Sequence, residues 1–194
     1  MLMVAIKRRH GTSCTVTVIG LSLALASLYF SMPITSSQVT PLIQIDGFSI
    51  FFSGLILLCA IIVACFSYPY FANLEDHQDE FYILLSVAVL GALVMVSNRH
   101  FITTFLGMET LSVCLYGMVA YPLHRSVAAQ YPMEASIKYL VLSALSSGFV
   151  LFGVALLYAQ TGTLQFSDLS IALAIGIDAV PPIYFVLCTL MIIS

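Results

Sequence analysis

The sequence predicts an all-α polytopic membrane protein, with about five complete transmembrane helices and a truncated sixth. Of the 194 residues, 61% are apolar and only 8% are charged, and the mean hydropathy is +1.08. Soluble domains carry about 25% charged residues, so this chain lacks the ionic groups that cover a water-exposed surface. One crossing takes about 20 residues. The predicted spans therefore fill the chain as a single transmembrane domain, residues 1–194, with no room for a soluble catalytic domain.

Six apolar runs, separated by polar or proline-containing segments, are the predicted spans. They cover approximately residues 14–32, 48–70, 81–97, 101–121, 133–159 and 183–194. The first run follows a basic stretch and also fits a cleavable signal peptide, but its length favours a retained span. The sixth run reaches only about a dozen residues before the sequence ends, well short of a crossing. We therefore expect the sixth helix to be incomplete.

The connections carry signals for where the helices begin and end. The second span is expected to end at Pro69, and residues 97–100 are short enough to close a tight helical hairpin. Gly162 is placed to supply a left-handed cap to the fifth span. The mixed segment 164–178 is expected to hold a short interfacial helix.

Basic residues in the short connections predict the orientation of the chain. Residues 7–9 and Arg125 fall on one side of the membrane, and Arg99 alone falls on the other. Because basic residues favour the cytoplasmic side, the N-terminus as given and the loops at 72–79 and 122–132 are expected to be cytoplasmic. No basic run is long enough to indicate nucleic acid binding.

Glu109 lies near the middle of the fourth span, about 12 Å from its start at 1.5 Å per residue. A charge at this depth costs on the order of 2.5–3.5 kcal/mol on insertion scales, and such acids often mark proton or ion pathways. We therefore expect Glu109 to face a protein interior or a wet cavity. Ser112 and Tyr116 lie on the same helical face, as candidates to hydrogen-bond Glu109 or to hold water beside it. The alternative is a protonated glutamate that serves helix packing alone.

Glu134 and Lys138 are four residues apart, in the order that favours an ion pair along a helix. Two interpretations remain open: a terminal salt bridge that anchors the fifth span, or a proton relay. Burial favours the neutral form of each group, whereas a neighbouring opposite charge favours the charged form. A change in their separation therefore transfers a proton without a cofactor. Glu109, Glu134 and Lys138 are the candidate relay residues.

Small residues form a stripe on the fifth span. Ser136, Ser143 and Ser147 share this stripe, and Ala144 and Gly148 lie four residues apart beside it. Small residues at this spacing usually let membrane helices approach closely, which favours packing over a polar channel wall. The five cysteines have no metal-ligand spacing, and most lie in apolar runs, so a structural role is expected.

Two motifs carry a family resemblance. Residues 105–112 (FLGMETLS) and 133–139 (MEASIKY) closely resemble the antiporter-like membrane subunit N of respiratory NADH–quinone oxidoreductase, complex I. Residues 146–153 and 157–162 continue the match, which extends over nearly the whole chain. The wider family includes cation/proton antiporter subunits and hydrogenase-linked membrane subunits.

The resemblance implies a proton-translocating subunit of a multi-subunit complex in a bacterial inner membrane. In such a complex, electron transfer from NADH to quinone drives proton pumping. The family glutamate matches Glu109, and the carboxylate and lysine of the next span match Glu134 and Lys138. A lysine at a broken helix, the family partner of that glutamate, is expected just beyond Ser194, so the chain resembles the N-terminal part of an antiporter-like helical bundle.

The expected partners are the other membrane subunits of complex I and the lipid bilayer. The sequence contains no glycine-rich dinucleotide fingerprint and no cysteine cluster suited to an iron–sulfur centre. No cofactor is therefore expected on this chain, which acts as an enzyme only within the complex. NAD, FMN, the iron–sulfur clusters and quinone belong to the parent complex. The alternatives are a cation/proton antiporter or hydrogenase-linked subunit, or a non-transporting membrane scaffold.

Overall fold

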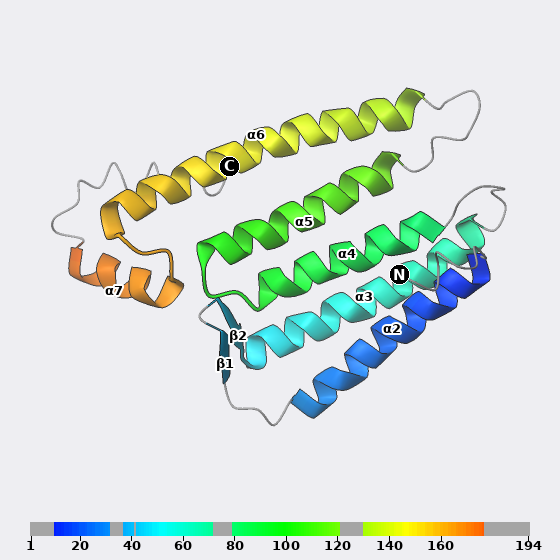
Figure 1. Cartoon of the computed structure of the whole chain (residues 1–194), viewed down its shortest axis with the longest axis horizontal. Helices are drawn as coiled ribbons and strands as arrows, with labels where there is room; N and C mark the ends of the chain where they lie inside the picture. The colour runs from blue at the N-terminus through cyan, green and yellow to red at the C-terminus, as the bar shows by residue number, and fades with distance from the viewer. Residues whose placement is uncertain (1–9, 32–36, 41, 72–78, 121–129, 177–194) are drawn as a thin grey trace.

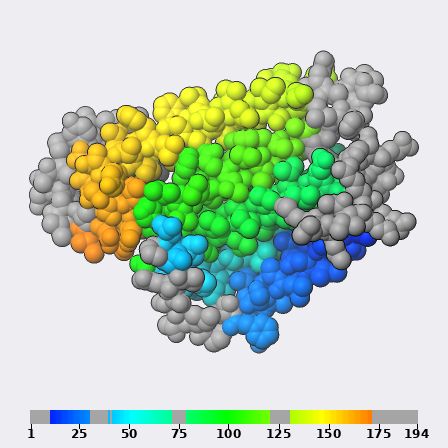
Figure 2. Space-filling model, viewed as in Figure 1, coloured from blue at the N-terminus to red at the C-terminus, as the bar shows by residue number. Residues whose placement is uncertain are grey.

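A computed structural model describes residues 10–31, 37–40, 42–71, 79–120 and 130–176. Within these residues, five long helices lie side by side and follow one another in chain order (Figure 1). They are α2 (His10–Ser31), α3 (Gly47–Phe71), α4 (Asp79–Val96), α5 (Phe101–Ala120) and α6 (Gln130–Thr161). Figure 2 shows them as successive bands across one broad face of the molecule.

Each of the five long helices is long and apolar enough to cross a membrane. Many large apolar side chains point outward from them, among them Phe66 (73% exposed) and Leu142 (66% exposed). Lipid accommodates such side chains, and a helix satisfies its backbone hydrogen bonds internally, as the hydrocarbon core requires. The predicted fold class, an all-α polytopic membrane protein, is confirmed.

The helices overlap the first five predicted spans, with one correction. The second predicted span was expected to end at Pro69, but α3 continues through Pro69 to Phe71. The prediction was wrong because a proline removes one hydrogen bond, to the carbonyl four residues earlier, and can kink a helix without ending it. The sixth predicted span, residues 183–194, lies outside the described residues. The short helix expected within residues 164–178 is present as α7 (Phe166–Gly176).

Two clusters of buried apolar side chains join α2 to α3 and α4. In one cluster, Cys14 of α2 packs with Ala64 and Tyr82. In the other, Leu21 of α2 packs with Leu57. The first helix is therefore an integral member of the layer.

A glycine from each helix lies where α4 and α5 cross. A Cβ atom on Gly91 would lie 2.9 Å from the carbonyl oxygen of Gly107, and a Cβ on Gly107 would lie 2.9 Å from that of Gly91. Close packing was expected instead at Ala144 and Gly148, but both are exposed, and a Cβ on Gly148 meets nothing within 4 Å. Within the described residues, the stripe contacts α5 through Ser136 and Ser147 rather than through Ala144 and Gly148.

A small antiparallel hairpin, β1 (Ser37–Thr40) and β2 (Ile43–Ile45), precedes α3. Asp46 and Ser49 then cap α3 reciprocally. The Asp46 Oδ1 atom accepts from the Ser49 N–H at 2.8 Å, and the Ser49 hydroxyl accepts from the Asp46 N–H at 2.9 Å. At the end of α6, Gly162 adopts a φ of 70° and closes the helix as the sequence predicts.

Backbone hydrogen bonds fasten the α4–α5 turn, residues 97–100, on two sides. One side bonds to the hairpin and the other to the segment that leads into α7. The bonds run from Gln44 N–H to Ser97 C=O (2.9 Å), Arg99 N–H to Leu42 C=O (3.0 Å), Phe101 N–H to Leu164 C=O (3.1 Å) and Phe166 N–H to Arg99 C=O (3.0 Å). We call this arrangement the backbone clamp (residues 42–44, 97–101 and 164–166).

Candidate functional site

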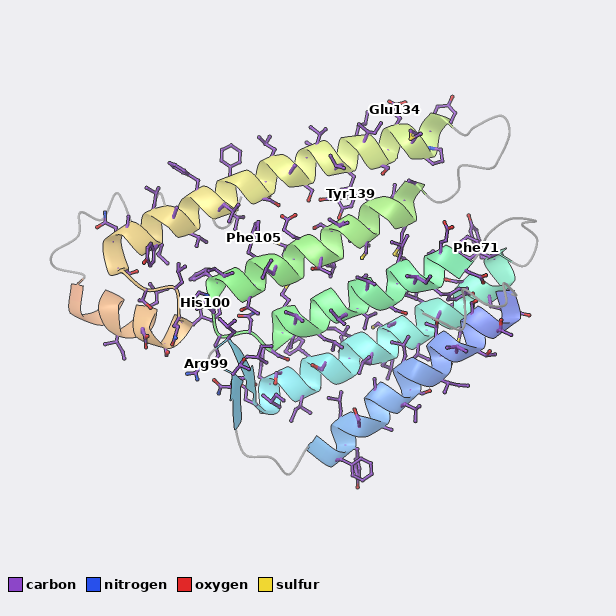
Figure 3. The ribbon with its side chains drawn as sticks, in the orientation of Figure 1. Phe71, Arg99, His100, Phe105, Glu134 and Tyr139 are labelled. Carbon is purple, nitrogen blue, oxygen red and sulfur yellow. The ribbon has the colours of Figure 1, made fainter. Side chains whose placement is uncertain are left out.

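Helix α5 directs Glu109 away from α4. Gly107 presses its backbone against Gly91 of α4. Two residues along an α-helix correspond to a rotation of about 200°, so Glu109 lies on the opposite face of α5, which is the face toward α6. Phe105, one turn before Glu109, is drawn between α5 and α6 in Figure 3.

Ser147 of α6 donates its hydroxyl hydrogen to the Oε1 atom of Glu109. Both residues are half-buried. The expected polar partner of Glu109 thus comes from the neighbouring helix rather than from α5 itself. A hydroxyl both donates and accepts hydrogen bonds, so Ser147 is able to contact the ionised or the protonated form of the carboxyl group.

Of the two supporting candidates on α5, Tyr116 lies in the same interface. Ser112 is buried. The ring of Tyr116 packs edge-on against Tyr139 of α6, with centroids 5.1 Å apart (Figure 3 labels Tyr139). Ser136 donates its hydroxyl to the Tyr116 carbonyl oxygen at 3.0 Å. Contacts between α5 and α6 therefore continue along the interface from Glu109 toward the start of α6.

Glu134 and Lys138 form an ion pair near the start of α6 (Figure 3 labels Glu134), with 2.5 Å between Oε1 and Nζ. The side chains are 57% and 70% exposed, respectively. Lys138 lies nine residues before Ser147, about 14 Å along the helix at 1.5 Å per residue. The structure therefore does not bring Glu109 into contact with this pair.

The exposed ion pair is expected to add little to stability. Lys138→Gln removes its cation, and exposed pairs contribute little because water screens them and long side chains lose entropy on pairing. We expect an unchanged thermal midpoint and helix content, measured by circular dichroism in detergent micelles. A clear fall in the midpoint would instead support the interpretation of a salt bridge that anchors the helix.

Of the three serines on the stripe of α6, two use their hydroxyl groups to reach α5. Ser147 contacts the Glu109 carboxylate and Ser136 contacts a backbone carbonyl. The spacing of small residues on this stripe had favoured helix packing over a polar channel wall. The spacing of Ser136, Ser143 and Ser147 was the available signal in the sequence. It places three hydroxyl groups on one face of the helix that follows the span of Glu109.

No three His, Cys, Asp or Glu side chains gather as metal ligands in the part of the chain that the structure describes. Cys14 and Cys114 are buried, whereas Cys59 and Cys65 are exposed, and all four are free thiols. The chemical groups at the α5–α6 interface are thus a carboxylate and neighbouring hydroxyls, which suit the gain and loss of a proton.

Comparison with known proteins bears directly on this arrangement. The family described as NADH:quinone oxidoreductase/Mrp antiporter, transmembrane, matches residues 98–194, which is half of the chain and contains Glu109, Glu134 and Lys138. The fold and this match define an antiporter-like integral membrane protein. The chain belongs to the NADH:quinone oxidoreductase/Mrp antiporter transmembrane family.

Two solved structures share the fold. One is a chain of respiratory complex I from Thermus thermophilus with bound aureothin, 27% identical, with a TM-score of 0.69 over 98% of this chain and 44% of that chain. The other is a chain of the membrane-bound sulfane sulfur reductase, an archaeal respiratory membrane complex. It is 24% identical, with a TM-score of 0.76 over 99% of this chain and 40% of that chain. The protein thus spans less than half the length of both matched chains.

Proposed function

We propose that the chain is a proton-translocating membrane subunit, of the subunit N type, of a NADH–quinone oxidoreductase. The observation that carries this proposal is the hydrogen bond between Ser147 and Glu109 across two membrane-spanning helices. Family membership and the match to a chain of a respiratory complex I support it. In this proposal, the other membrane subunits are the partners, and the redox cofactors and quinone belong elsewhere in the complex.

Glu109 is the proposed proton acceptor and donor, and Ser147 positions its carboxyl group. Ser112 and Tyr116 support a hydroxyl and water path along the α5–α6 interface. The Glu134–Lys138 pair is the second relay position, about 14 Å farther along α6 at 1.5 Å per residue. The proposed orientation in a bacterial inner membrane places this pair toward the cytoplasm and the backbone clamp toward the opposite side.

Replacement of Ser147 by alanine tests the positioning of Glu109. Because Ser147→Ala removes the hydrogen bond without introducing bulk, we expect the rate of NADH-driven proton translocation to fall several-fold while the complex still assembles. The rate is measured as acidification of inverted membrane vesicles that contain the assembled complex. Ser170→Ala, on the exposed face of α7, is the control with an unchanged rate. Equal rates for both variants would remove Ser147 from the proposal.

A cation/proton antiporter subunit is the second candidate function, because the matched family includes Mrp antiporters. The two candidates differ in the ion that they require. We expect NADH-driven acidification of the vesicles to persist in sodium-free and potassium-free buffer, since a carboxylate and hydroxyls suffice for proton transfer. A rate that depends on an added alkali cation would favour the antiporter.

A further inference from the structure

An open cavity of about 390 Å³ lies beside the backbone clamp, between the hairpin, the start of α3, the end of α4 and the start of α7. This volume falls in the range of about 300–1,000 Å³ that is typical of ligand sites. Its apolar wall consists of Val96 together with Phe48, Phe52, Met95 and Phe166. The cavity is separate from Glu109 and Ser147, which do not line it.

Arg99 supplies a cation to this cavity. The clamp holds its backbone from both sides, with the N–H bonded to Leu42 and the carbonyl bonded to Phe166. Its guanidinium group forms no ion pair or hydrogen bond with the other residues that the structure describes. Figure 3 shows Arg99 beside the hairpin. A guanidinium group that has not paired with a carboxylate is suited to a phosphate, which it binds through two parallel hydrogen bonds.

Asp46 supplies an anion to the same lining. One carboxylate oxygen caps α3 through the Ser49 N–H, and the group does not pair with Arg99. Gln44 lies beside Asp46 and adds an uncharged amide. The cavity thus presents one positive and one negative side chain that do not neutralise each other directly. A ligand with a phosphate and an amine matches both.

The apolar wall indicates that the ligand has a hydrocarbon part. Phe48 is 66% exposed, Met95 is 41% exposed and Phe52 is 36% exposed. They lie at the same ends of α3 and α4, two helices of membrane-spanning length, so they border the hydrocarbon region. A free phosphate ion would leave this wall uncovered, whereas an acyl chain covers it.

We propose that this cavity binds the headgroup of a zwitterionic glycerophospholipid. Arg99 and Gln44 bind the phosphate, and Asp46 attracts the cationic amine. An acyl chain lies along Phe48, Phe52 and Met95. The lipid thereby bridges the hairpin and the ends of α3 and α4.

The test measures lipid binding to the full chain in detergent micelles by isothermal titration calorimetry. The probes are dioctanoyl phosphatidylethanolamine, dioctanoyl phosphatidylglycerol and inorganic phosphate. We expect the zwitterionic lipid to bind about tenfold more tightly than phosphatidylglycerol, the effect of one additional contact to a charged group. Equal binding of the two lipids, or a phosphate affinity equal to that of the zwitterionic lipid, would overturn the proposal.

Two charge variants preserve the local fold. Arg99→Gln leaves the clamp intact because its bonds are made by backbone atoms, and we expect it to weaken lipid binding about tenfold, as for a lost hydrogen bond to a charged group. Asp46→Asn retains the cap, since asparagine caps helices as well as aspartate does, and should remove the preference over phosphatidylglycerol. Lys138→Gln, a cation removed from the other end of the layer, should bind lipid as the unmodified chain does. Unchanged binding by Arg99→Gln, with normal helix content by circular dichroism, would contradict the assignment.

Discussion

Glu109→Gln is expected to lower the rate of NADH-driven proton translocation by at least about tenfold, because positioned proton-transfer groups commonly contribute more than this. Glutamine has nearly the same shape as glutamate and retains an oxygen that accepts the hydrogen bond from Ser147. It cannot gain or release a proton in the physiological pH range. The measurement is the acidification of inverted vesicles, with assembly of the complex checked by native electrophoresis.

Glu80→Gln is the matched control for this change. It neutralises another glutamate, which is exposed in the first turn of α4 and lies outside the proposed path. We expect it to translocate protons at the unmodified rate. Normal translocation by Glu109→Gln in a fully assembled complex would refute the proton-carrying role and favour the membrane scaffold.

Gly107→Ala is expected to destabilise the helical layer by about 1–3 kcal/mol, the usual effect of overpacking. The added Cβ atom would lie 2.9 Å from the Gly91 carbonyl oxygen and 3.0 Å from the Met95 backbone nitrogen. These are backbone atoms, so α4 and α5 must separate to make room. The free energy of unfolding is measured by titration of mixed micelles with a denaturing detergent, followed by circular dichroism.

Gly148→Ala is the control for Gly107→Ala because it makes the same change in another long helix. A Cβ on Gly148 has no neighbour within 4 Å. Alanine is favoured over glycine inside a helix by about 1 kcal/mol, so this variant should be as stable as the unmodified chain or slightly more stable. Equal destabilisation by both variants would show that close α4–α5 contact is not the cause.

The spans and several helix ends were predictable from the sequence because their signals are local. Hydrophobic length marks α2 to α6, and Gly162 marks the end of α6 through the conformation that glycine adopts readily. The hairpin was not predicted, since β2 is joined to Ser97 and Asn98, which are distant in the sequence. The Gly91–Gly107 contact could not be predicted for the same reason. Each glycine allows a close approach only when the other, which is distant in the sequence, lies opposite it.

The site was predictable in part. The burial cost of a charge singles out Glu109, and the spacing of Glu134 and Lys138 predicts their ion pair. The exposure of Glu134 and Lys138 could not be predicted from the sequence, because a membrane helix is apolar on its lipid-facing and protein-facing sides alike. For the same reason, Ser147 fitted helix packing as well as it fitted a hydrogen bond to Glu109.

The hydrogen bonds of the backbone clamp form in a fixed order during synthesis of the protein. The central segment of the clamp is the turn after α4. It leaves the ribosome after the hairpin but well before Leu164 and Phe166. At about 5–20 residues per second, several seconds pass while α5 and α6 are translated. During that interval, the backbone groups of Arg99 and Phe101 that will bond to the later segment depend on water. The two hydrogen bonds that join the turn after α4 to residues 164–166 therefore form only after α5 and α6 have been translated.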